Sequence, residues 1–203
     1  MTRLSEKNAM DRVLSEEEWE RLIKVLPQHA AYIVTAAYHT GMRAGEIFGM
    51  TWDRVNTRDG YFSLTPGDTK TGGGRRVYFN EEVREILGRL GKVRSISHNF
   101  VFTHRDEPLK SIKVGLASAL KKAKITNFRL HDLRHTYTTN ARKAGVHETV
   151  IMKLTGHKTL SMFTRYNTVD EADAKQALIL MEGHLANTGQ PTTARLLQDQ
   201  KRG

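Results

Sequence analysis

The sequence of 203 residues contains no cysteine, few aromatic residues (7%) and no long apolar run. The lack of cysteine excludes a disulfide framework, cysteine-ligated zinc or iron–sulfur sites and a cysteine nucleophile. No run of 18 apolar residues is present, so we expect no membrane-spanning segment. The first 15 residues include Glu6 and Asp11 and no apolar stretch, which does not match a secretory signal. These absences predict a protein of the cytoplasm.

Positive charge is the strongest feature of the composition. Lysine and arginine number 32 against 22 acidic residues, so the formal net charge is +10, and the pI is near 9.9. A strongly positive field attracts polyanions, and nucleic acid is the first class to consider. Charge alone also fits a basic surface that has no specific site, so the argument needs motifs.

The length predicts one folded domain with extensions at both ends. Residues 1–11 are polar and read as a linker remnant or the end of an expressed fragment. Residues 12–182 hold the patterned part of the chain. Residues 183–203 are polar, contain Gly189 and Pro191, and are expected to form a flexible tail.

Apolar residues at helical spacing predict most of the elements. Ser15 and Glu18 form a capping-box pattern at the start of the first helix. Gly41 suits the left-handed end of a second helix over residues 30–40. Further helices are expected at residues 43–50, 80–90, 110–123, 131–144, 147–154, 159–166 and 171–182.

Three short strands are expected between the early and the late helices. They cover residues 53–56, 61–65 and 75–79. Asp59-Gly60 is a tight-turn signal between the first two strands, and Gly72-Gly73-Gly74 opens a looser loop before the third. The predicted fold class is therefore mainly α with a small antiparallel β-sheet near one edge (α+β).

Searches for cofactor and metal motifs fail. Gly67 and Gly72 stand at the spacing of a phosphate-binding loop, but Gly73 follows where that motif needs lysine. His131 and His135 lie four residues apart on one helical face, which supplies fewer than the three protein ligands of a zinc site. The acidic residues are scattered among basic ones, unlike those of a two-metal nuclease. We therefore expect no cofactor and no metal.

The remaining candidates are cationic and proton-transferring side chains at the ends of helices and hairpins: Arg43, Lys70, His131, Arg134, His157 and Tyr166. Arginine forks match nonbridging phosphate oxygens and stay charged, and phosphoryl transfer needs mainly positioning and charge neutralisation. A phenol can act as a covalent nucleophile, although its pKa of about 10 means that cationic neighbours must help it ionise. A lysine can return a proton to the departing alkoxide.

Five segments resemble, in the same order, the motif boxes of the tyrosine recombinases, the phage-integrase family. They are Thr40–Ile47 (first arginine box), Thr69–Gly72 (hairpin lysine), His131–His135 (His-x-x-Arg box), Thr155–His157 (Leu-Gly-His box with threonine for leucine) and Arg165-Tyr166 (nucleophile). The resemblance covers about residues 12–182. Each box alone is weakly specific, whereas five in order are strongly specific.

The resemblance implies site-specific cleavage and rejoining of double-stranded DNA by a phage or mobile-element integrase. Tyr166 would form a 3′-phosphotyrosyl link and free a 5′-hydroxyl. Arg43 and Arg134 would clamp the nonbridging oxygens, and Lys70 would protonate the 5′-oxygen. The phosphotyrosyl bond keeps the energy of the broken linkage, so rejoining would need neither ATP nor a metal.

Supporting roles follow from the same resemblance. His131 would assist proton transfer, and His157 would hydrogen-bond the phosphate. Glu46 would orient the site without touching DNA, and His135 is expected to satisfy a backbone carbonyl among packed helices. Contacts to the DNA backbone, which position a protein without reading sequence, are expected from Arg75, Arg76, Lys121, Lys122, Lys124 and Arg165.

Members of this family usually carry a core-binding helical domain before the catalytic one. Here the catalytic pattern starts within the first 15 residues, so we expect a catalytic-domain fragment or a truncated product that lacks the N-terminal domain. The expected partners are double-stranded DNA and further copies of the chain, which would be monomeric in solution and tetrameric in a synapse on bacterial nucleoid DNA. Residues 171–182 would dock onto a neighbouring protomer or, alternatively, pack on their own core.

Other functions stay open at this point. A type IB topoisomerase shares the chemistry but relaxes supercoils without joining two sites, and the short chain favours the recombinase. A non-catalytic DNA-binding regulator would have no need of Tyr166. A basic helical interaction module would need none of the motif boxes.

Overall fold

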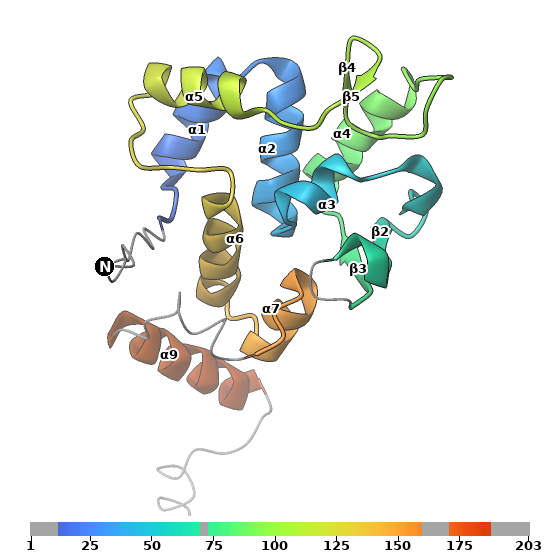
Figure 1. Ribbon diagram of the computed structural model, residues 1–203. Coiled ribbons are helices and arrows are strands. Elements are labelled where there is room, and N and C mark those ends of the chain that lie inside the picture. Colours follow the sequence, from blue (N-terminus) through green and yellow to red (C-terminus); the bar gives the residue numbers. More distant parts are fainter. Residues whose placement is uncertain (1–11, 70–72, 160–170, 188–203) are drawn as a thin grey trace, which may run out of the picture. The chain divides into compact units, whose positions relative to one another are not determined.

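The computed structural model describes residues 12–69, 73–159 and 171–187 (Figure 1). The chain divides into two compact units, Met1–Tyr166 and Asn167–Gly203. Within the described residues no helix is both long enough and apolar enough to cross a bilayer. The predicted helix over residues 159–166 lies almost wholly outside the described residues.

The first two helices follow the predicted capping and packing signals. In α1 (Glu16–Val25) the Ser15 side chain accepts from the Glu18 amide, and the Glu18 side chain accepts from the Ser15 amide. Trp19 of α1 stacks on Tyr38 of α2 (Gln28–Thr40), with the ring centroids 3.9 Å apart. Most of α2 is buried, so this helix forms the centre of the first unit.

Short helices complete the first unit around α2. These are α3 (Ala44–Phe48), α4 (Glu81–Gly91), α5 (Lys113–Lys122), α6 (Asp132–Lys143) and α7 (Glu148–Thr155). Helix α2 packs against α3, α4 and α6, and α7 packs against α6 and the sheet. The helices lie where the apolar spacing predicts them, within a few residues at each end.

The sheet has the predicted three antiparallel strands in the order β1-β2-β3, namely β1 (Val55–Asn56), β2 (Tyr61–Leu64) and β3 (Arg75–Tyr78). Phe62 of β2 lies opposite Val77 of β3, and both side chains are buried in the core. The first strand is shorter than predicted, because Trp52–Arg54 form the short 3-10 helix η1, which buries Trp52. A second such helix, η2 (Pro66–Asp68), follows β2.

A second, two-stranded hairpin was not expected from the sequence. It consists of β4 (Thr103–His104) and β5 (Glu107–Pro108). The two residues between the strands, Arg105 and Asp106, both adopt positive φ, at 54° and 62°. A two-residue hairpin turn requires this conformation. Because glycine or asparagine usually signals it, the Arg-Asp pair gave no sign of the turn.

The second unit contributes one described helix, α9 (Glu171–Asn187). It begins at the predicted residue but continues five residues past the predicted end, so residues 183–187 are helical rather than part of a tail. Docking of this helix onto a neighbouring protomer stays a prediction. The fold class is the predicted one, mostly helical with small antiparallel sheets.

Candidate active site

Two helices end at the candidate site, each on a glycine in the left-handed conformation. Gly41 ends α2 at φ 62°, and Gly156 ends α7 at φ 75°. The Gly41 carbonyl accepts a hydrogen bond from Nη1 of Arg134 at 2.7 Å. The Gly156 carbonyl accepts one from Nη2 of Arg43 at 3.4 Å. Carbonyl groups at helix ends attract cations, so each helix end holds one of the two predicted catalytic arginines.

Arg134 and His157 are in direct contact. Arg134 lies in the first turn of α6 and is only 3% exposed. Its second terminal nitrogen, Nη2, lies 3.1 Å from Nε2 of His157. Arg43 contacts the Gly156 carbonyl and Arg134 contacts the His157 ring, so both guanidinium groups reach the same dipeptide at the end of α7. The structure therefore brings together both arginines and the histidine that the sequence selected.

Glu46 is the buried anion of this network. Its side chain is 2% exposed and accepts hydrogen bonds from the backbone amide and Nη1 of Arg43, at 2.9 and 3.1 Å. Arg75 approaches the same carboxylate with two nitrogens, at 3.1 and 2.7 Å. Burial pushes the pKa of Glu46 upward, but the hydrogen bonds and charges of Arg75 and Arg43 outweigh burial and lower it. Glu46 therefore remains a carboxylate near neutral pH.

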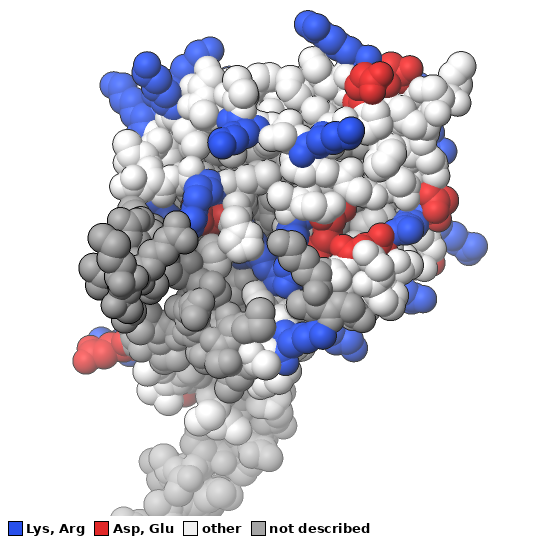
Figure 2. Space-filling view, viewed as in Figure 1, with Lys and Arg blue, Asp and Glu red and all other residues white. Residues whose placement is uncertain are grey.

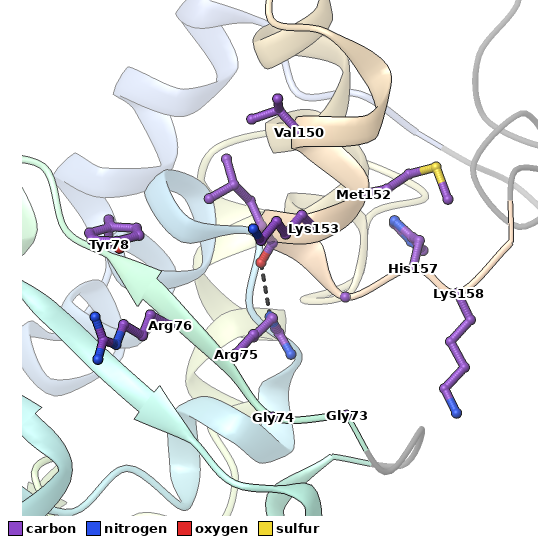
Figure 3. Close-up of a pocket in the computed structure, with 12 residues that line it drawn as sticks. Gly73, Gly74, Arg75, Arg76, Tyr78, Val150, Met152, Lys153, His157 and Lys158 are labelled. Carbon is purple, nitrogen blue, oxygen red and sulfur yellow. Dashed lines mark hydrogen bonds between the residues drawn. The ribbon is translucent and has the colours of Figure 1, made fainter.

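The structure corrects the predicted environment of Arg75. The sequence placed this residue among exposed cations that contact DNA, but its side chain is only 8% exposed. Its Nε donates to the Leu154 carbonyl of α7 at 2.9 Å, shown as the dashed line in Figure 3. Arg75 faces the same side of β3 as buried Val77, whereas Arg76 faces the other side. The two-residue alternation of a strand was the signal that could have identified Arg75 as an inward-facing residue.

The two imidazoles of the site lose their protons readily. Burial and then the charges of Arg134 and Arg43 lower the pKa of His157 from 6.5 to about 3. The pKa of His131 is also lowered, first by burial and then by His135 and Arg134. Both rings are therefore neutral near pH 7. Burial is the main cause of both shifts, and the arginine charges add to it.

His131 and His135 lie side by side at the start of α6. Their ring centroids are 5.1 Å apart in an edge-on arrangement. His135 is buried, and the pairing expected between it and a backbone carbonyl stays a prediction. His131 also lines a cavity of about 480 Å³ between α3 and α5, and the wall of this cavity is mainly apolar.

A cavity of about 520 Å³ opens between β3 and α7, beside His157 (Figure 3). Its lining includes the cationic residues Arg76, Lys153 and Lys158. The last two were not among the predicted DNA contacts, because they belong to no charge cluster in the sequence. Across the face shown in Figure 2, Lys and Arg side chains recur while acidic ones gather in few places.

Other predicted cations lie away from this cavity. Lys121 and Lys122 end α5, and Lys124 follows the C-cap residue Ala123. Helix α5 packs against α1 and lies at the opposite end of the first unit from α7 (Figure 1). Their contact with DNA stays a prediction.

Three predicted site residues, Lys70, Arg165 and Tyr166, lie outside the described residues. The described residues on either side of the segment that contains Lys70 are Thr69 and Gly73. The Thr69 hydroxyl accepts a hydrogen bond from the Gly73 amide and donates one to the Gly73 carbonyl, each at 3.1 Å, and Gly73 lines the cavity beside His157. Within residues 12–69, 73–159 and 171–187, no three acidic or histidine side chains cluster closely enough to hold a metal ion.

Comparisons with known proteins point to one family. A model of the phage integrase family matches residues 12–173. The integrase of Salmonella phage P22 is 26% identical over 175 residues, which cover 79% of this chain and 44% of that protein. Tyrosine recombinase XerA of Pyrococcus furiosus is 26% identical over 182 residues, which cover 83% of this chain and 61% of that protein. The chain thus spans about half the length of the curated relatives it matches.

Solved structures share the fold. A XerA recombinase superposes with a TM-score of 0.69 at 22% identity, over 84% of this chain and 65% of that one. The Tn1549 transposon integrase in complex with a circular intermediate DNA gives 0.71 at 19% identity, over 88% and 68%. The catalytic domain of bacteriophage HP1 integrase gives 0.60 at 22% identity, over 76% and 85%.

Proposed function

Because the chain belongs to the phage integrase family, we propose that it cleaves and rejoins double-stranded DNA at specific sites through a 3′-phosphotyrosyl intermediate. The observation that carries this proposal is the network in which Arg43 and Arg134 reach two consecutive residues, Gly156 and His157. Two guanidinium groups brought to one place can neutralise the nonbridging oxygens of one phosphodiester.

The proposed cleavage step uses residues of both described and undescribed segments. The Tyr166 oxygen attacks the phosphorus, the bond to the 5′-oxygen breaks, and the 3′-phosphate becomes joined to the phenol. Lys70 supplies the proton that the departing 5′-oxygen needs. Attack by a 5′-hydroxyl reverses these bond changes and joins the strands. The phosphotyrosyl bond conserves the energy of the original linkage, so neither ATP nor a metal takes part.

The electrostatics of the site support the assignment of its proton acceptor. A phenol must lose its proton as it attacks, and the acceptor must be unprotonated beforehand. The lowered pKa of His131 leaves that ring neutral near pH 7, and it lies at the start of the helix that carries Arg134. His131 is therefore the proposed acceptor for the proton of Tyr166.

Buried charge distinguishes this proposal from a non-catalytic DNA-binding module. Placing a carboxylate and several arginines in the interior costs solvation free energy that packed apolar side chains would not cost. A module that only holds DNA can use exposed lysines and arginines for that purpose. The topoisomerase-like alternative gains no support from the relatives named above, which are integrases and tyrosine recombinases.

The partners are proposals of the same kind. Relatives have been solved with DNA, among them a lambda integrase dimer bound to a core site. We propose that this chain also binds double-stranded DNA, that four copies form the synapse, and that an N-terminal core-binding domain completes the recombinase in the cytoplasm. The large excess of positive charge is consistent with DNA as the partner.

Trapping of a covalent adduct tests the proposed function. The chain is incubated with nicked duplexes whose cleavage releases a short 3′-terminal fragment, and the products are separated on a denaturing gel. We expect a protein–DNA adduct with the wild-type chain, no adduct with Tyr166→Phe, and unchanged yield with EDTA. Arg134→Ala should lower the cleavage rate about 100-fold or more, because one charge-stabilising donor contributes about 2.7–4 kcal/mol. Abundant adduct from Tyr166→Phe would contradict the proposal.

A further inference from the structure

The end of α7 places a buried hydroxyl directly beside His157. Thr155 Oγ1 lies 2.7 Å from the Ile151 carbonyl one turn earlier and 3.4 Å from the Met152 carbonyl. A carbonyl oxygen only accepts, so the hydroxyl must donate its single hydrogen in this direction. The same Oγ1 lies 2.8 Å from Nδ1 of His157. Because its hydrogen is already used, Oγ1 accepts in this contact, and Nδ1 carries a hydrogen.

A second contact assigns the other ring nitrogen independently. Arg134 Nη2 lies 3.1 Å from Nε2 of His157. A guanidinium has donors only and does not lose its charge in proteins. Nε2 must therefore accept, which requires that it carries no hydrogen. Both contacts describe the same neutral tautomer, and the lowered pKa of His157 agrees with a neutral ring.

We propose that Thr155 is a positioning residue, which holds His157 as the Nδ1–H tautomer and directs Nε2 toward Arg134. The inference deepens the proposed function and rests on it, since the family resemblance implies that His157 hydrogen-bonds the scissile phosphate. Threonine replaces the leucine of the family's motif box at this position. An apolar side chain could pack at the same place, but it could not accept from Nδ1.

The tautomer has a consequence for how His157 contacts the phosphate. An unprotonated Nε2 accepts from Arg134 and cannot donate to a phosphate oxygen. Donation requires an additional proton at Nε2, and the imidazolium then donates from both nitrogens. Thr155 remains an acceptor for Nδ1 in either form, because its own hydrogen stays on the Ile151 carbonyl. The ring can therefore keep one orientation while Nε2 changes from acceptor to donor.

Nitrogen NMR of the free protein tests this assignment without DNA. The chain is labelled with ¹⁵N-histidine, and the His157 ring signals are identified by comparison with His157→Gln. At neutral pH the wild type should show a protonated Nδ1 and an unprotonated Nε2. Thr155→Val leaves the Nδ1 hydrogen without an acceptor, so the ring should turn away from Arg134 and shift toward the Nε2–H tautomer, whereas Thr155→Ser should match the wild type.

Thr138→Val is the matched control. Thr138 is also buried, and its hydroxyl donates to the carbonyl one turn earlier, that of Arg134, at 2.9 Å. This variant loses the same type of helix bond but should retain the wild-type tautomer of His157. Single-turnover cleavage should fall on the order of 10-fold in Thr155→Val, by analogy with residues that orient metal-ligating histidines, and Thr155→Ser should restore most of the rate.

The two proposals fail in different ways. A wild-type ring protonated at Nε2, or a tautomer that does not change in Thr155→Val, overturns the role of Thr155 whatever the cleavage assay shows. An unchanged cleavage rate in Thr155→Val overturns the positioning role as well. If Thr155→Val does not fold, the wild-type spectrum still decides the tautomer. The expected spectra without any covalent adduct would contradict the proposed function and leave the tautomer assignment intact.

Discussion

Arg75 and Glu46 form a buried ion pair that connects three elements of the site. Arg75 is the first residue of β3. It binds Glu46 of α3 with two nitrogens and donates to the carbonyl of Leu154 in α7. The same carboxylate holds the backbone amide and the guanidinium of Arg43. A single arginine on the sheet thus fixes the position of a residue that is proposed to bind phosphate.

Removal of Arg75 is predicted to destabilise the fold and impair cleavage together. Arg75→Ala leaves a buried carboxylate with one of its two arginine partners, which should cost roughly 3 kcal/mol of unfolding free energy. Arg76→Ala is the control, because Arg76 is exposed and lies over the Tyr61 ring, a contact that contributes about 0.5–1 kcal/mol. Urea denaturation of both variants measures the difference. Equal losses of unfolding free energy in Arg75→Ala and Arg76→Ala would contradict a large contribution of the buried ion pair to stability.

His157 is predicted to make stability depend on pH. The pKa of its ring is held at about 3 in the folded chain, against an ordinary value of 6.5. Between these values the unfolded chain binds a proton that the folded chain does not, so the free energy of unfolding should rise with pH across this window. Urea denaturation from about pH 4 to about pH 7 should give a shallower rise for His157→Gln than for wild type. Identical slopes would contradict the lowered pKa.

The sequence identified the cations of the site more reliably than their surroundings. Arg43, Arg134 and His157 were predicted together, and the structure connects them. The inward position of Arg75 was missed because two adjacent arginines read as an exposed pair when strand alternation is not applied. The hydroxyl of Thr155 could not have been assigned either, since its partners depend on how α7 ends.

At the level of the elements, the ends of α2 and α7 do the positioning. Both finish on a left-handed glycine, and both free carbonyl groups then point at an arginine. Gly41 was predicted from its place after an apolar periodic segment, because only glycine adopts this conformation without strain. The contact that its carbonyl makes depends on where α6 lies, which no local pattern encodes.

Gly41→Ala is predicted to disturb this arrangement. The left-handed conformation costs a residue with a Cβ about 1–2 kcal/mol, and the added Cβ would lie 2.5 Å from the Tyr137 ring. Unfolding free energy should fall by more than that amount, and cleavage should fall because the acceptor of Arg134 moves. Gly88→Ala, in α4 with no atom within 4 Å of the new Cβ, should instead gain roughly 0.5–1 kcal/mol. A stable and active Gly41→Ala variant would refute this reading of the helix end.

Elements without a local signal were the ones that the sequence missed. The hairpin of β4 and β5 turns through Arg105 and Asp106, both at positive φ without a glycine. The short helix η1 replaced half of the first predicted strand, because burying Trp52 decides the path of the chain there. Burial of one side chain sets the conformation of η1, and local propensity does not report it.

At the scale of the whole molecule, the first unit carries the residues that are proposed to hold a single phosphodiester. The family model covers most of the first unit and only the start of the second, and the chain spans about half the length of its curated relatives. Phosphate contacts release counterions, so DNA binding by this chain should weaken steeply as salt rises.

The most direct test of the account is the chemical identity of the protein–DNA link. The trapped adduct is digested with protease and nuclease, and the modified peptide is sequenced by mass spectrometry. The account predicts a nucleotide joined through its 3′-phosphate to Tyr166, together with a released strand that begins with a 5′-hydroxyl. A link to any other residue, or one through a 5′-phosphate, would contradict it.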